Sequence, residues 1–361
     1  MKQALLIVML FQSQLYAQSG DSVFHDFSLT IQRASIWTER PSLQPFTRNH
    51  PWSVQLDWGM IHTKTRSWNY CQCYTRNGLS AGYTNFANPQ QLGQAVTVSA
   101  FTEPVLAHTD RLRLSVRGSA GFAFLSKVYD SVTNKEPIFF STPISFLLTM
   151  GVNLEYRLSE HFWITAAGQF NHISNGGRRD PNEGMNFIGT SLSLRYVMKP
   201  ATLISRQKTK YTGRGPVMMV HGFGNIHTAQ ATPVFQAEHK WVAGVNAGLI
   251  QRLGRMTGLG AGGEYYYDGL NEVYQQRSHQ PLQTGVGSVS LQHYLFLGKL
   301  LFGQQFAWYV TTQTGQAQPT YQRYFLEYEI RDNWYAGFSL KAHGDHSDYM
   351  AFSIGHSIKL R

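Results

Sequence analysis

Apolar and polar residues alternate with a period of two along most of this chain. In residues 111–124 the even positions are apolar or small, whereas the odd positions carry three arginines and two serines. Residues 144–157 repeat the pattern, with seven large apolar side chains in succession on the even face. Because residues two apart share a face of a β-strand, both segments predict long strands with one apolar and one polar face.

Similar segments recur throughout the chain and, with weaker candidates at 24–37 and 79–86, predict about 14 to 16 strands. The other predicted strands are 53–62, 94–105, 161–174, 184–197, 216–224, 239–252, 256–267, 285–297, 300–311, 321–331, 333–343 and 348–360. We expect short connections such as 159–161 and 331–333 to be periplasmic turns. The longer polar stretches, expected to be outer loops, are 126–141, 175–183, 268–283 and 312–320.

Strands of this kind suit an all-β fold, a transmembrane antiparallel β-barrel with lipid outside and polar side chains inside. A secreted β-sandwich also alternates, but its strands are usually shorter and their polar face lies in bulk water. Charged residues make up only 14 % of the chain, against roughly 25 % in an ordinary soluble domain. Composition therefore favours the barrel.

The N-terminal residues 1–17 have the pattern of a secretory signal peptide. One positive charge at Lys2 precedes an apolar run from Ala4 to Phe11, and the small residue Ala17 precedes a polar stretch. The apolar run is too short to span a bilayer as a helix, so we expect export and cleavage after Ala17.

The basic segment 198–215 alternates poorly and divides the chain into two halves with about eight predicted strands each. We place the halves at 18–200 and 201–361. Leu154-Glu155-Tyr156 in the first half recurs as Leu326-Glu327-Tyr328 in the second, which suggests a degenerate repeat. A single barrel of all strands and two small barrels in tandem are both compatible with this pattern.

Net charge and cysteine content add little to this picture. The formal net charge is +10, and because the chain carries an export signal, anionic lipid headgroups are a better partner than nucleic acid. Cys71 and Cys73 could form a disulfide in an oxidising compartment or stay free. We assign the two cysteines no role.

Candidate chemistry appears where the lipid-facing pattern becomes polar. The apolar face of segment 161–174 ends in His172 and Ser174, and the apolar face of segment 184–197 begins with Asn186. Antiparallel pairing through the intervening loop would bring Asn186 back beside the other two residues. Three polar side chains are therefore predicted to meet on the outer wall, near one membrane interface.

These residue types at this spacing fit nucleophilic catalysis. Side chains two residues apart point the same way, so the imidazole of His172 can take the proton of the Ser174 hydroxyl. The third group of such a site orients the imidazole, a role that the side-chain oxygen of Asn186 could fill. Glu183, the nearest acid, is the alternative orienting residue.

The loop after Ser174 offers groups for an oxyanion and for a phosphate. Asn175, Gly176 and Gly177 can turn backbone N–H groups toward an attacked carbonyl, because glycine tolerates unusual backbone angles. Arg178 and Arg179 could hold lipid phosphates in a fork geometry.

The segment from His172 to Asn186 resembles the PagL-type lipid A 3-O-deacylases, also grouped as acyloxyacyl hydrolases. The resembling residues are His172-Ile173-Ser174-Asn175-Gly176-Gly177 and Pro181-Asn182-Glu183-Gly184-Met185-Asn186, followed by an alternating strand. That family has a small outer-membrane barrel with a Ser–His–acid site on its outer wall. The resemblance, which covers about residues 111–197, implies lipid A deacylation in the outer membrane of a Gram-negative bacterium without a metal or cofactor.

Residue by residue, the resemblance implies Ser174 as the nucleophile, His172 as the base, and Asn175 and Gly177 as the oxyanion region. Asn182 matches a polar loop position, which we assign to substrate binding.

Asn186 stands where the PagL family has a glutamate, so the third member of the site departs from the pattern. The segment is also similar to outer-membrane phospholipase A, a calcium-dependent dimer that uses His-x-Ser-Asn-Gly with an asparagine in third place. A phospholipid substrate and a homodimer therefore stay open. Alternatives of another class are a porin or structural barrel, and a binding scaffold that keeps an inactive motif.

A second polar cluster lies between His343 and Asp348. Under the gapless alignment of the two halves, His172 corresponds to Gly344 and Ser174 to His346, so a repeat would have lost the site. We interpret this cluster as a polar outer loop.

Overall fold

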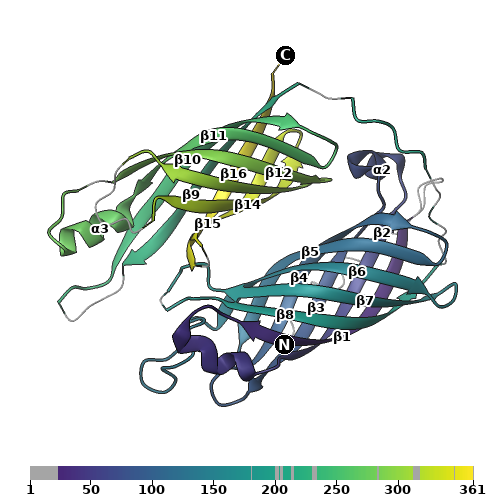
Figure 1. The fold of residues 1–361 in the computed structure, drawn as a ribbon, viewed down its shortest axis with the longest axis horizontal. Coiled ribbons are helices and arrows are strands. Elements are labelled where there is room, and N and C mark those ends of the chain that lie inside the picture. The colour runs from purple at the N-terminus through teal and green to yellow at the C-terminus, as the bar shows by residue number, and fades with distance from the viewer. Residues whose placement is uncertain are drawn as a thin grey trace, which may run out of the picture.

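The computed structural model describes residues 23–179, 181–199, 203, 206–212, 215–229, 234–282, 284–311, 318–344 and 346–360. Within these ranges, sixteen strands close into two antiparallel barrels of eight strands each. Figure 1 shows the first barrel in purple to teal and the second in green to yellow. Of the two architectures compatible with the sequence, the structure has two small barrels in tandem.

Pairing of β1 with β8 closes the first barrel, and pairing of β9 with β16 closes the second. The first barrel consists of β1 (Val23–Trp37), β2 (Trp52–His62), β3 (Thr75–Asn88), β4 (Gly93–His108), β5 (Leu112–Leu125), β6 (Ile144–Arg157), β7 (Phe162–Ser174) and β8 (Met185–Val197). The second consists of β9 (Val217–Ala229), β10 (Glu238–Arg252), β11 (Thr257–Asp268), β12 (Gly285–Leu297), β13 (Leu300–Tyr309), β14 (Thr320–Arg331), β15 (Trp334–His343) and β16 (His346–Lys359).

Each of the predicted segments, including the two weaker candidates, overlaps one of these strands, so the all-β barrel is confirmed. The ends differ by a few residues, most of all at β9, which continues to Ala229. The last residues of β9 were not predicted as strand because polar side chains interrupt the alternation there. These polar side chains have hydrogen-bond partners in the structure: the side-chain amide of Asn225, for example, donates to the carbonyl of Met350 (2.6 Å). The predicted signal peptide, residues 1–17, lies outside the described residues.

Three short helices were not predicted: η1 (Pro41–Arg48), α2 (Thr65–Cys71) and α3 (Gly269–Arg277). The carboxylate of Asp268 starts α3, since it accepts hydrogen bonds from two backbone N–H groups of the first turn. Cys71, the last residue of α2, forms a disulfide with Cys73, one of the two states that the sequence left open. In the part of the chain described here, no helix is both long and apolar enough to cross a membrane.

Charged side chains fill the barrel interiors in pairs. In the first barrel, Arg76 lies 2.5 Å from Asp26, and in the second, Arg323 lies 2.7 Å from Glu264, with all four side chains almost fully buried. A buried charge is costly unless it is paired, so these contacts explain how polar faces can point inward. The predicted arrangement, with polar residues inside and apolar residues outside, is confirmed.

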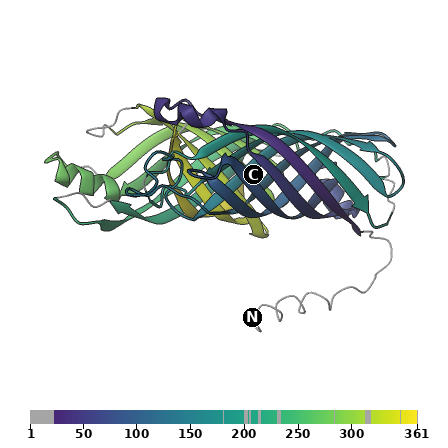
Figure 2. The same cartoon turned by 90° about the horizontal axis from the view of Figure 1, so that it is seen from below.

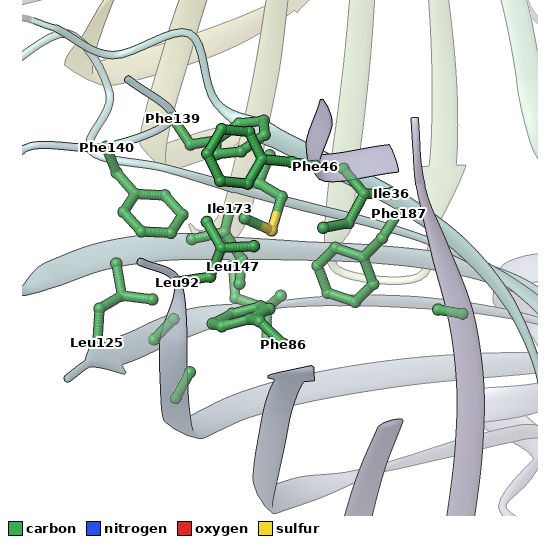
Figure 3. Close-up of a cluster of buried hydrophobic side chains, with 14 of the residues drawn as sticks. Ile36, Phe46, Phe86, Leu92, Leu125, Phe139, Phe140, Leu147, Ile173 and Phe187 are labelled. Carbon is green, nitrogen blue, oxygen red and sulfur yellow. The ribbon is translucent and has the colours of Figure 1, made fainter. Parts of the chain in front are cut away.

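Apolar side chains close one end of the first barrel. Figure 3 shows this cluster, in which Phe46 from η1 and Phe139 and Phe140 from the β5–β6 connection pack onto inward-facing strand residues. Ile173 of β7 belongs to the cluster and is 0 % exposed. Burial of Ile173 fixes the phase of β7 at the point where the candidate site begins.

Both barrels point the same way. The chain enters and leaves each eight-stranded barrel at one end, which we call the turn end; the other end, the loop end, carries the connections 38–51, 126–143, 175–184 and 269–284. Figure 1 shows α2 and the link between the barrels at the turn end, with η1 and α3 toward the loop end. Figure 1 shows the barrels side by side, and Figure 2 shows that they are staggered along their length, with α3 projecting at one extreme.

Candidate functional site

His172 and Ser174 lie at the loop end of β7, on its outward face. Outward positions of β7 alternate with buried inward ones such as Trp163 and Ile173. Because Ile173 is held in the apolar cluster inside the barrel, its two neighbours in the strand must point outward. The predicted face of the candidate pair is therefore the one that the structure has.

His172 is held by Asn186 of the neighbouring strand. The two residues are direct partners in the β7–β8 register, and Nδ1 of His172 lies 2.6 Å from Oδ1 of Asn186. An amide oxygen only accepts hydrogen bonds, so Nδ1 carries the hydrogen in this contact. In the neutral imidazole, Nε2 is then left as the acceptor, which is the tautomer that a general base needs.

Gly184 marks the place where the His172 ring and Ser174 converge. It has a φ of +70°, and a Cβ built on it would lie 2.7 Å from Cε1 of His172 and 3.5 Å from Cβ of Ser174. The same point is 3.3 Å from Nε2 of His172. Among the described residues no hydrogen bond joins His172 to Ser174, and such catalytic contacts often tighten only when substrate binds.

The turn after Ser174 is shaped by the side chains of two asparagines. The N–H of Asn175 donates to Oδ1 of Asn182 (2.8 Å), and the amide nitrogen of Asn175 donates to the carbonyl of Arg179 (2.6 Å). The N–H of Arg178 donates to Oδ1 of Asn175 (3.1 Å). Asn182, predicted to bind substrate, is buried and fixes the backbone of this turn instead of facing an open surface.

Two backbone donors of the predicted oxyanion region differ in availability. The N–H of Asn175 is already used by Asn182. Gly176 and Gly177 have φ values of +68° and +74°, and within the described residues no hydrogen bond is donated by either of their N–H groups. The structure thus leaves Gly177 free for the predicted role, together with Gly176, whereas Asn175 would first have to release its bond.

The remaining candidates lie in the loop between β7 and β8. Glu183, the alternative orienting residue, forms an ion pair of 2.6 Å with Arg40 near η1. Arg178 and Arg179 are exposed on the loop.

The second barrel packs directly onto this turn, a feature that sequence reasoning missed. The N–H of Met350 in β16 donates to the carbonyl of Gly176 (2.8 Å), and Nε2 of His227 in β9 contacts the carbonyl of Gly177. Ser174 is only 2 % exposed. The alternation of residues within a strand cannot predict such a contact, because the contact depends on how two closed barrels pack against each other.

The polar cluster of β15 and β16 is internally paired. Nδ1 of His343 lies 2.9 Å from Asp348, and Nζ of Lys341 lies 2.6 Å from the other oxygen of the same carboxylate. Among the described residues, no three histidine, cysteine or acidic side chains are grouped so that they could hold a metal ion.

Two sequence models of protein families match the chain, one on each barrel. Residues 45–195 match the model described as lipid A 3-O-deacylase (PagL), and residues 217–360 match the model described as acyloxyacyl hydrolase, C-terminal domain. No match was found among curated proteins.

Solved structures give weaker likenesses. The outer membrane enzyme PagL is 14 % identical, with a TM-score of 0.33, over 46 % of this chain and 97 % of that chain. Neisserial surface protein A (NspA) is 11 % identical, with a TM-score of 0.32, over 49 % of this chain and 99 % of that chain. A mutant Rh. blastica porin is 9 % identical, with a TM-score of 0.19, over 94 % and 100 %. Family membership therefore rests on the two sequence models.

Proposed function

Because the chain belongs to the lipid A 3-O-deacylase (PagL) family, we propose that it hydrolyses ester-linked acyl chains of lipid A in the outer membrane of a Gram-negative bacterium. The observation that carries the proposal is the contact between Nδ1 of His172 and Oδ1 of Asn186, which leaves Nε2 as the acceptor in a ring that lies, with Ser174, beside Gly184. A neutral imidazole in this orientation is suited to activate a hydroxyl.

In the proposed reaction, Nε2 of His172 takes the hydroxyl proton while Oγ of Ser174 attacks the ester carbonyl carbon. The bond to the sugar oxygen then breaks, and the proton passes from His172 to that oxygen. Water, deprotonated by His172, attacks the resulting acyl-serine. The fatty acid leaves as the proton returns to Ser174.

Backbone donors would stabilise the negative charge on the carbonyl oxygen during both steps. The N–H groups of Gly176 and Gly177 are the available pair, and a donor of this kind is typically worth about 10²–10³ in rate. The exposed Arg178 and Arg179 are proposed to bind the phosphates of the headgroup.

The decisive experiment is lipid mass spectrometry after expression of wild-type protein and Ser174→Ala. We expect wild type to convert lipid A to a form lacking one ester-linked chain, and Ser174→Ala to lower this conversion by about 10³-fold or more. The matched control is Ser159→Ala, in the turn before β7 at the other end of the same barrel. Equal deacylation by wild type and Ser174→Ala would rule out the mechanism.

The phospholipase alternative is favoured only by Asn186 in third place. Removing calcium with a chelator distinguishes the lipid A deacylase from the phospholipase, because the lipid A reaction proposed here should persist without calcium. Calcium-dependent loss of phospholipid chains, with lipid A unchanged, would favour the phospholipase.

A further inference from the structure

A long apolar crevice separates the outer walls of the two barrels. Its cavity has a volume of about 2570 Å³, against roughly 300–1,000 Å³ for ordinary ligand pockets. Leu148, Met150 and Phe170 line it from the first barrel, and Leu326, Phe338 and Leu340 line it from the second. We propose that this inter-barrel crevice binds the acyl chains of the lipid substrate, so that the second barrel forms half of the substrate site.

The crevice leads to the candidate catalytic residues. His172 and Asn186 both belong to its lining. At the loop end the two barrels touch, with the rings of Phe146 and Phe338 6.2 Å apart. A chain lying in the crevice would therefore have its ester end beside the imidazole.

The other end of the crevice is narrowed by α2. The ring of Tyr70 lies 3.8 Å from the point where a Cβ of Gly298 would stand, in the β12–β13 turn of the second barrel. Tyr70 and Gly298 also line the cavity. The space thus extends along the walls of both barrels, from the site to the turn end.

The apolar lining of the crevice favours acyl chains as its occupant. Both walls present the outward faces of strands, which in a membrane barrel meet hydrocarbon. At about 2570 Å³ the cavity is larger than one small molecule needs, and residues of both barrels line it, so several acyl chains could share it. Contact with two apolar walls removes more chain surface from the bilayer than a single convex wall can, and shape complementarity then discriminates between chains.

The proposed acyl-chain site rests on the proposed function, and the experiment is designed so that failure of the crevice and failure of the esterase give different results. Leu326→Trp and Leu340→Trp would each fill part of the crevice, whereas Leu249→Trp places the same bulk on the outward face of β10, away from it. For each full-length variant, we would measure lipid A deacylation, hydrolysis of p-nitrophenyl butyrate, and labelling of Ser174 by a fluorophosphonate.

We expect the two crevice variants to slow lipid A deacylation about tenfold or more, with butyrate hydrolysis, labelling and the Leu249→Trp control unchanged. Lipid A deacylation at the wild-type rate in both crevice variants would overturn the crevice while leaving the esterase intact. Absence of labelling and of both hydrolyses in wild type would instead overturn the proposed function.

A binding measurement tests the crevice whether or not the protein proves to be an esterase. Ser174→Ala protein would be mixed with lipid A carrying a photoreactive diazirine on one acyl chain, with and without excess phospholipid. We expect cross-links at Leu326 and Leu340 to survive the competition, and any at Leu249 to disappear. Equal competition at all three positions would show that only bulk membrane lipid enters the crevice.

Discussion

At the candidate site, the orientation of each side chain is fixed by the residues next to it. Ile173 is locked inside the barrel, so His172 and Ser174 face outward, and Asn186 then stands directly opposite His172. Alternation and antiparallel pairing are local rules, and they allowed these positions to be predicted. The link from Asn175 to Asn182 was not predictable, because it depends on backbone angles within an irregular loop.

Replacing Asn186 tests the orienting contact. Asn186→Leu removes the acceptor of the Nδ1 hydrogen, so we expect butyrate hydrolysis to fall by about 10²–10⁴-fold. Asn186→Asp keeps an acceptor and adds negative charge, so activity should be retained, with the acid limb of its pH profile at higher pH because the imidazolium is stabilised. Wild-type rates in Asn186→Leu would contradict the assigned role.

Gly184→Ala tests the space between His172 and Ser174. Its Cβ would come within 2.7 Å of the imidazole, and the positive φ adds strain, so we expect activity to be nearly lost while the barrel still forms. Heat-modifiable migration on gels reports barrel formation, and Gly222→Ala, where no atom lies within 4 Å of the new Cβ, is the control. A fully active Gly184→Ala would show that the ring lies elsewhere during catalysis.

At the scale of elements, the β7–β8 turn is held between strands of two barrels. The carbonyls of Gly176 and Gly177 accept bonds from β16 and β9. Carbonyl and N–H of one trans peptide point in opposite directions, so the bond to the Gly176 carbonyl also fixes the direction of the Gly177 N–H. Helices η1, α2 and α3 escaped prediction because each has too few residues for a helical period to stand out.

His227→Leu should loosen this turn from the side of the second barrel. We expect kcat for butyrate to fall by about tenfold or less, since the donors stay present but are less well placed, whereas KM should change little. The control, His239→Leu, removes a histidine on the neighbouring strand β10, where it contacts Thr228. A change in KM alone would point to substrate binding and not to positioning of the turn.

At the scale of the whole molecule, sequence alone could not choose between one barrel and two. Alternation is a property of each strand, whereas closure depends on pairing between β1 and β8 and between β9 and β16, far apart in the chain. The meeting of the two walls depends on both closures. The inter-barrel crevice was therefore out of reach of sequence reasoning.

Filled interiors argue against a porin. Arg117 lies 2.6 Å from Asp57 in the first barrel, and Arg323 lies 2.7 Å from Glu264 in the second. An eight-stranded barrel leaves room for little beyond side chains. We expect no stable porin-sized conductance when the protein is added to planar bilayers, with a known porin as the positive control. Large, persistent current steps would revive the porin alternative.

The link between the barrels at the turn end has a consequence for biogenesis. Each barrel's first and last strands lie within its own half of the chain, so the first can fold as a unit before the second is inserted. His172 and Asn186 would then already be paired, whereas the carbonyls of Gly176 and Gly177 would still lack their contacts with β16 and β9. Pulse-labelling with a fluorophosphonate during assembly should capture a short-lived species less reactive than the mature protein, and constant reactivity would indicate that both barrels close together.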